Sequence, residues 1–147
     1  MPDDSDAARA FLVARLGGTR YEARALEQLD SALTFEDPEY LAVLAHELPS
    51  DRIRGLVLFG TVSGARGVVK LHLVLGDDVL PCERIVCAVR DVAVGGAERL
   101  IVAELPDDAP FARGAAALMA CGFVEEGRVE DFVRDGVAMR MLTARPS

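Results

Sequence analysis

The stretch Ala116-Ala117-Leu118-Met119-Ala120-Cys121-Gly122-Phe123-Val124-Glu125-Glu126-Gly127 decides the fold of this 147-residue chain. Its alanine-rich first part predicts a helix over residues 111–120, and Gly122 suits the left-handed position that follows a helix end. Residues 123–128 and 136–143 are then predicted as two strands joined by the turn Arg134-Asp135-Gly136. Residues 99–105, which precede this helix, are apolar on both faces, as is typical of a central strand. The last third of the chain is therefore predicted as strand, helix, strand, strand.

The rest of the chain predicts two helices, three strands and a further helix. Helical periodicity covers residues 7–16, with Asp6 as the N-cap, and residues 21–33. Apolar runs bounded by turn residues predict the three strands, and a proline in its first turn marks the further helix. These segments are, in order, residues 40–47, 55–62 and 68–75 for the strands and 80–94 for the helix.

This order of elements predicts an α/β (α+β) fold in a single domain over residues 1–147. The expected architecture is a mixed, mostly antiparallel sheet of about six strands flanked by about four helices. The strand, helix, strand step across residues 68–105 should be a right-handed crossover. Within the strand 68–75, strict alternation predicts two faces. One face carries Val69, Leu71, Leu73 and Leu75, and the other carries Val68, Lys70, His72 and Val74.

Composition and charge exclude several classes of protein. The net charge is −8 and arginine is interleaved with acidic residues, so the chain repels polyanions and nucleic acid is not an expected partner. No apolar run approaches the ~20 residues that cross a bilayer, and the acidic N-terminus is not a secretory signal. The cysteines Cys82, Cys87 and Cys121 have no metal-binding spacing. We therefore expect a cytoplasmic protein with reduced thiols, no bound metal and no membrane partner.

The Gly122-Phe123 junction and the hairpin after it resemble the C-terminal half of the GNAT superfamily of N-acetyltransferases. Residues 39–60 are similar to the first long hairpin of that family, so the resemblance covers nearly the whole chain. It implies transfer of an acetyl group from acetyl-CoA to a small-molecule or peptide amine. It also implies a homodimer formed through the late strands.

The resemblance places acetyl-CoA between the two parallel strands 68–75 and 99–105. Leu73, Val74 and Leu75 would then contact it, with Arg84 and Ile85 at the pyrophosphate. In the family a glycine-rich loop binds that group, because glycine lets backbone N–H groups approach the phosphates closely. Here residues 77–94 contain no glycine, and Arg84 is the remnant of the pattern. The chain thus resembles a divergent member of the family with a degenerate pyrophosphate loop.

The resemblance also implies that a general base lies on the central strands. His72 is the leading candidate and Glu104 is a second one, whereas His46, Glu47 and an ordered water remain alternatives. The positive charge of Lys70, on the same predicted face, should lower the proton affinity of His72 and keep the imidazole neutral.

The position that often carries a tyrosine general acid in the family is occupied here by Leu118, which cannot donate a proton. Cys121 is the nearest replacement in sequence. Two functions consequently stay open, an active N-acetyltransferase and a catalytically inactive GNAT-fold domain acting as a dimerisation or regulatory binding module. Acceptor specificity should lie in the variable segments, which are residues 17–21, 34–38 and 129–135.

Overall fold

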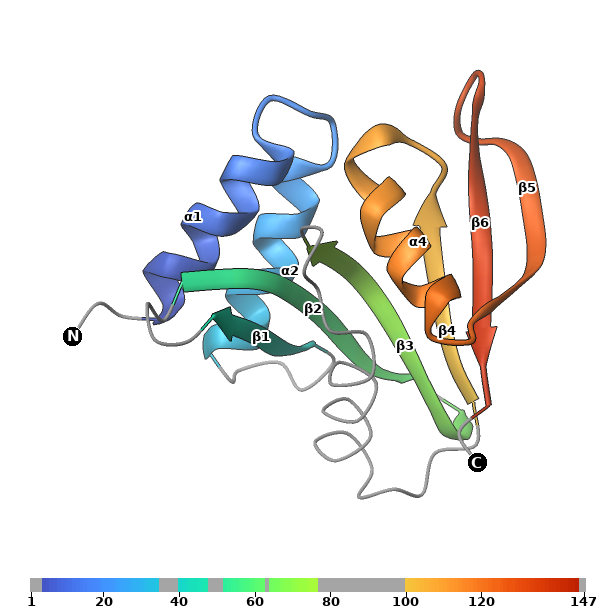
Figure 1. Ribbon diagram of the computed structural model, residues 1–147, viewed down its shortest axis with the longest axis horizontal. Coiled ribbons are helices and arrows are strands. Elements are labelled where there is room, and N and C mark those ends of the chain that lie inside the picture. Colours follow the sequence, from blue (N-terminus) through green and yellow to red (C-terminus); the bar gives the residue numbers. More distant parts are fainter. Residues whose placement is uncertain (1–3, 35–39, 48–51, 63, 77–99, 146–147) are drawn as a thin grey trace.

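The computed structural model describes residues 4–34, 40–47, 52–62, 64–76 and 100–145. These residues form one six-stranded sheet with helices on both faces (Figure 1). The helices are α1 (Asp4–Leu16), α2 (Glu22–Thr34), the short 3-10 helix η1 (Ala109–Phe111) and α4 (Ala112–Ala120). The strands are β1 (Leu41–Glu47), β2 (Arg52–Val62), β3 (Ala65–Gly76), β4 (Leu100–Pro106), β5 (Val124–Arg134) and β6 (Val137–Ala144).

The strand order is β1-β2-β3-β4-β6-β5. Strands β3 and β4 run parallel, whereas each other neighbouring pair is antiparallel. The predicted mixed, mostly antiparallel sheet is therefore confirmed. Three of the expected helices are confirmed as α1, α2 and α4. The fourth, over residues 80–94, and with it the hand of the crossover, lies outside the described residues.

Glycine follows both α1 and α4, at Gly17 and at the predicted position Gly122. The N–H of Gly17 donates to the carbonyl of Val13 at 2.8 Å after α1. At the end of α4, Gly122 has φ +97°, and the N–H of Phe123 donates to the carbonyl of Leu118 at 3.0 Å. This backward bond satisfies a free carbonyl of the last turn and directs the chain into β5. The prediction of Asp6 as N-cap is wrong, because α1 already begins at Asp4.

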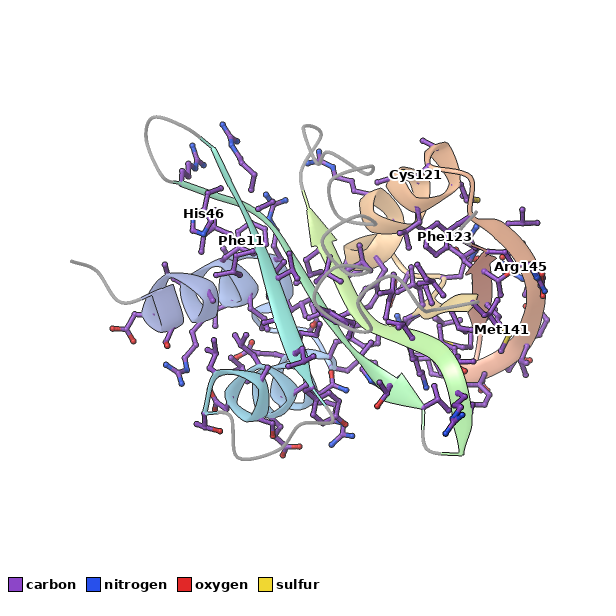
Figure 2. All side chains as sticks on the ribbon, turned by 90° about the horizontal axis from the view of Figure 1, so that it is seen from below. Phe11, His46, Cys121, Phe123, Met141 and Arg145 are labelled. Atoms are coloured by element: carbon purple, nitrogen blue, oxygen red, sulfur yellow. The ribbon has the colours of Figure 1, made fainter. Side chains whose placement is uncertain are left out.

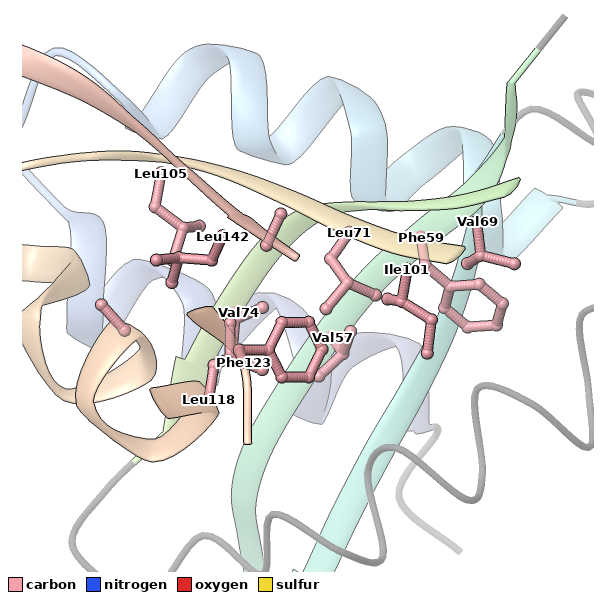
Figure 3. Close-up of a cluster of buried hydrophobic side chains, with 12 residues drawn as sticks. Val57, Phe59, Val69, Leu71, Val74, Ile101, Leu105, Leu118, Phe123 and Leu142 are labelled. Carbon is pink, nitrogen blue, oxygen red and sulfur yellow. The ribbon is translucent and has the colours of Figure 1, made fainter. Parts of the chain in front are cut away.

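Two apolar clusters pack on the two faces of the sheet. One lies under α1 and α2 and includes Leu12, Leu29 and Leu58. The other lies under α4 and includes Leu71, Leu118 and Phe123, whose side chains meet in Figure 3. Each helix thus buries its apolar stripe against the sheet, which is how short amphipathic helices gain stability.

A β-bulge in β3 overturns the predicted alternation of that strand. Leu71 is paired with Phe59 and Leu73 is paired with Leu58, so His72 is an extra residue without a partner on β2. The bulge shifts the side chains that follow to the opposite faces. Leu71 consequently packs under α4, whereas Leu73 packs under α1 and α2.

The remaining differences from the predicted strands are smaller. Strands β2 and β3 each begin three residues earlier than predicted, and β5 continues to Arg134 because cross-strand pairing carries polar residues into the ladder. In β4, Ile101, Ala103 and Leu105 are buried while Glu104 is half-buried, so this central strand is not apolar on both faces. None of the described helices combines the length and the apolar character needed to cross a bilayer.

Candidate functional site

The parallel strands β3 and β4 pair along only part of their length. Their register runs from Val68 opposite Leu100 to Leu71 opposite Ala103 and then ends, although β3 continues to Gly76 and β4 to Pro106. His72, the bulged residue, is the next residue of β3. A bulge bends its strand and increases the local twist, which accounts for the end of the pairing at this point. The two strands therefore part at the level of His72 and Glu104.

His72 lies in a partly buried setting on the face covered by α1 and α2. The ring of Tyr40 meets the imidazole edge to face, with 4.9 Å between centroids and 65° between planes. Burial, and after it the positive charge of Lys70, lowers the pKa of His72 below its ordinary value, while the charge of Glu104 opposes this shift. The imidazole is consequently neutral near pH 7, in the form that can accept a proton. The predicted effect of Lys70 is confirmed.

Two further polar contacts surround this histidine. Lys70 Nζ lies 3.2 Å from Glu104 Oε2 and so bridges the two parallel strands. Arg24 on α2 donates through Nη2 to the hydroxyl of Tyr40 at 3.2 Å. Side chains from α2, from the residue before β1, from β3 and from β4 thus converge where the strands part. We call Arg24, Tyr40, Lys70, His72 and Glu104 the β3–β4 cluster.

The residues expected to contact acetyl-CoA are divided between the two faces of the sheet. Leu73 and Leu75 are buried under α1 and α2, whereas Val74 is buried under α4. Their side chains belong to the core, so the main chain is the part of this segment that could meet a ligand. Arg84 and Ile85 lie outside the described residues.

The alternative bases lie elsewhere in the sheet. His46 is next to the end of the edge strand β1 and is paired with Ile53, whereas the start of β1 faces the bulge through Phe59. Five residues of strand separate Leu41 from His46, roughly 17 Å. Figure 2 shows His46 beside Phe11 of α1, away from α4. His46 is therefore not part of the β3–β4 cluster, and the backbone of its neighbour Glu47 pairs with Arg52 at the same end of β1.

Neither Leu118, at the position of the family's general acid, nor its nearest replacement Cys121 is in this cluster. Leu118 is buried in the core under α4, as expected of a residue without a proton to give. Cys121 is the C-cap of α4 and its N–H bonds to the carbonyl of Leu118 at 3.0 Å.

A second polar cluster, which the sequence did not identify, lies where the loop between α1 and α2, the start of η1 and the end of β5 meet. Its centre is Asp108, which follows β4. Tyr21 donates its hydroxyl to Asp108 Oδ2 at 2.8 Å, and Arg134 Nη2 donates to the same oxygen at 3.2 Å. These residues line a pocket of ≈ 350 Å³ together with Thr19, Arg20 and Pro110. We call it the Asp108 pocket.

The Asp108 pocket brings together two of the three segments expected to set acceptor specificity. Tyr21 ends the segment 17–21, and Arg134 belongs to the segment 129–135. The third segment, residues 34–38, is described only at Thr34. Tyrosine, aspartate and arginine at such large sequence separations give no local signal, so only the fold reveals the pocket.

No protein-family model matches the sequence, and no curated protein matches it. Solved structures do match its fold. A GNAT-family protein from Desulfovibrio desulfuricans gives a TM-score of 0.74 at 20% identity, covering 99% of this chain and 94% of its own. The chain has the GNAT fold. An aminoglycoside 6'-N-acetyltransferase complexed with coenzyme A gives a TM-score of 0.71 at 13% identity, covering 100% of this chain and 95% of its own.

A third GNAT structure is a spermidine/spermine N-acetyltransferase from Vibrio cholerae. It gives a TM-score of 0.64 at 13% identity, covering 97% of this chain and 90% of its own. The GNAT fold predicted from the Gly122-Phe123 junction is thereby confirmed. At these identities the likeness extends to the fold, and the roles of individual residues rest on the geometry given above.

Proposed function

We propose that this GNAT-fold chain, as a single domain over residues 1–147, transfers an acetyl group from acetyl-CoA to an amine. The observation that carries the proposal is the end of β3–β4 pairing at the bulged His72. There, open strand edges and a neutral imidazole occur together. The strand edges supply main-chain groups for binding an extended ligand, and the imidazole supplies a base.

Acetyl-CoA would lie between β3 and β4 beyond Leu71 and Ala103. In this part of the sheet the N–H and C=O groups that face the gap have no partner strand within the described residues, so an extended amide-containing arm can bond to the main chain of Leu73, Val74 and Leu75. Arg84 and Ile85 are proposed to hold the pyrophosphate. One structural neighbour is described as complexed with coenzyme A and another with its cofactor acetyl-CoA, which supports this donor.

The proposed chemistry is a direct attack without a covalent enzyme intermediate. The amine nitrogen forms a bond to the acetyl carbon, and a main-chain N–H of β3 stabilises the negative charge on the carbonyl oxygen. His72, or a water next to it, takes the proton from the nitrogen. Glu104 holds Lys70 through their ion pair and partly offsets its charge at His72. The C–S bond then breaks and the electron pair stays on sulfur.

Departure of the sulfur does not require a protein acid at the position of Leu118. A thiol has a pKa near 8.5, so a thiolate is a stable leaving group compared with an alkoxide. It can take its proton from water after the bond has broken. The buried Leu118 is therefore compatible with turnover, and the β3–β4 cluster favours an enzyme over an inactive binding module.

The acceptor is proposed to be a small-molecule or peptide amine. Two of the structural neighbours bear the names of acetyltransferases for aminoglycosides and for spermidine and spermine, which are small amines. The acidic net charge of the chain agrees with a substrate that carries an amino group.

We also propose a homodimer formed through β5. This strand is at the edge of the sheet and is exposed along most of its length. It exposes three large apolar side chains, Val124 (61% exposed), Val129 (55%) and Phe132 (64%). Exposed apolar side chains on an edge strand favour association. A second copy of β5 would cover them.

Release of free thiol from acetyl-CoA, followed over a panel of primary amines, tests the function. We expect amine-dependent thiol release in the unaltered protein. His72→Ala should lower kcat at unchanged affinity for acetyl-CoA, by about 10²-fold or more for a lost general base. Amine-dependent release that is the same in both proteins would reject His72 as the base, and no release with any amine would reject the enzyme.

A further inference from the structure

The Asp108 pocket has a preorganised frame. Asp108 Oδ1 accepts from the N–H of Ala109 at 2.9 Å, while Oδ2 accepts from both Tyr21 and Arg134. The Tyr21 ring is also held against Phe111, with 4.8 Å between centroids in an edge-to-face contact. The loop between α1 and α2, the start of η1 and the end of β5 are thus tied together by one carboxylate.

The residues that line the pocket carry a net positive charge. The hydrogen bonds from the Tyr21 hydroxyl and the Arg134 guanidinium hold the pKa of Asp108 below the ordinary carboxyl value, and the charge of Arg134 offsets the charge of this carboxylate. The Asp108 bond uses one nitrogen of Arg134, whose side chain is 52% exposed. Arg20 lines the same pocket and makes no hydrogen bond or ion pair with the described part of the chain. A chain of net charge −8 therefore presents two guanidinium groups against one carboxylate here.

The positions of both arginines relative to Tyr21 support a common site. Burial, followed by the bond to Asp108, raises the pKa of the Tyr21 hydroxyl, and the charges of Arg134 and Arg20 both oppose that shift. Both cations are thus within electrostatic reach of the hydroxyl that lines the pocket. Guanidinium N–H groups in a planar fork match the geometry of a carboxylate.

We propose that the Asp108 pocket binds a carboxylate of the acceptor, so that the substrate is an amine of amino-acid or short-peptide type. The volume of ≈ 350 Å³ is at the small end of ligand pockets and suits such a molecule. Asp108 is four residues beyond Glu104 on the same strand and its following loop, a reach of at most about 14 Å. A molecule of a few residues can span from Arg20 and Arg134 to the β3–β4 cluster.

This inference rests on the proposed function, since it identifies the substrate class of the same site. It can nevertheless be tested without turnover. The probes are two matched pairs of ligands, triglycine with triglycinamide and lysine with cadaverine. Each pair keeps the amine and differs in the carboxylate.

Binding of these four ligands is measured by NMR titration of the isotope-labelled protein without acetyl-CoA. We expect triglycine or lysine to shift the amide signals of residues 19–21 and 108–110, and its partner without a carboxylate to bind roughly tenfold more weakly or worse. Equal affinity within both pairs, or shifts confined to other residues, would overturn the inference.

The variant Arg20→Ala separates ligand binding from the internal frame, because Arg20 takes no part in the bonds to Asp108. It should abolish most of the preference for the carboxylate while leaving the melting temperature unchanged. Arg145→Ala is the matched control, since it removes one arginine charge from the end of β6, where Arg145 pairs with Glu126. A preference that survives Arg20→Ala and also Arg134→Lys would overturn the assignment of the arginines.

A separate titration with acetyl-CoA distinguishes the two proposals. Binding of acetyl-CoA together with equal affinity inside each ligand pair overturns the carboxylate site and leaves the acetyltransferase. Carboxylate-dependent binding without any acetyl-CoA binding supports the pocket and contradicts the acetyltransferase.

Discussion

Gly114 of α4 lies directly against the main-chain carbonyl of Val74 on β3, beyond the point where β3 and β4 part. A Cβ atom at Gly114 would overlap the Val74 oxygen and would lie 3.2 Å from Val74 Cγ1. The first turn of α4 can approach β3 this closely only because residue 114 has no side chain. The helix therefore forms one wall of the gap between the two strands.

Gly114→Ala is expected to destabilise the protein by about 1–3 kcal/mol, because the new methyl group must displace α4 from main-chain atoms that cannot move aside. Urea unfolding followed by circular dichroism measures this change. Gly127→Ala is the matched control. A Cβ there meets only Met141 Cβ at 3.8 Å, which is ordinary contact. Equal effects of the two substitutions would contradict the close approach at Val74.

The pKa of His72 is expected to lie below the ordinary value of about 6.5, since burial and Lys70 both disfavour the imidazolium. NMR titration of the two histidines measures it, with His46→Gln for assignment. Lys70→Met should raise the pKa of His72, whereas Arg145→Met should leave it unchanged. An imidazole that titrates above 6.5 would contradict the environment described here.

The same shift has a consequence for stability. Because the folded-state pKa of His72 is below the unfolded value, the unfolded chain binds the extra proton as the pH falls through about 6.5. The contribution of His72 to stability is therefore present above that pH and declines below it. His72→Gln should flatten this part of a plot of unfolding free energy against pH, and an unchanged slope would count against it.

The bulge at His72 shows what the sequence could and could not predict. The end of α4 was predictable because Gly122 and the apolar residue after it form a local capping motif. The strand 68–75 instead offers regular alternation without glycine or proline, and the extra residue arises from pairing with β2. Long-range pairing of this kind leaves no local signal.

The Asp108 pocket was missed for a similar reason. The bond between Tyr21 and Asp108 joins residues 87 positions apart, and that between Arg134 and Asp108 joins residues 26 positions apart. Charged and aromatic residues in loops are common, so the family resemblance could mark segments 17–21 and 129–135 as variable but could not pair their side chains.

Tyr21→Phe should reduce stability by at most about 1 kcal/mol near neutral pH, since it removes a hydrogen bond to a partly solvated carboxylate. Asp108 has a lowered pKa in the folded state, so its contribution is present above the ordinary carboxyl pKa and is lost as the pH falls through the folded value. The effect of Tyr21→Phe should shrink over the same range. A double-mutant cycle with Asp108→Asn measures the coupling, and a coupling of zero would contradict the bond.

Phe132→Asp is expected to shift the protein from dimer to monomer in analytical ultracentrifugation, because it places a charge at the most exposed apolar residue of the proposed β5 interface. Val13→Asp alters another exposed apolar residue, on α1, and should leave the dimer intact. If the unaltered protein sediments as a monomer at concentrations of about 100 μM, far above the Kd of a standard-sized interface, the dimer is rejected.

Calorimetric titration with acetyl-CoA tests the central claim, that the gap between β3 and β4 at His72 is an acetyl-donor site. We expect saturable binding of one molecule per chain with micromolar affinity, about −8 kcal/mol, and weaker binding to Gly114→Ala than to Gly127→Ala. Binding that is absent at millimolar acetyl-CoA, or equally strong in the two glycine variants, would contradict this account.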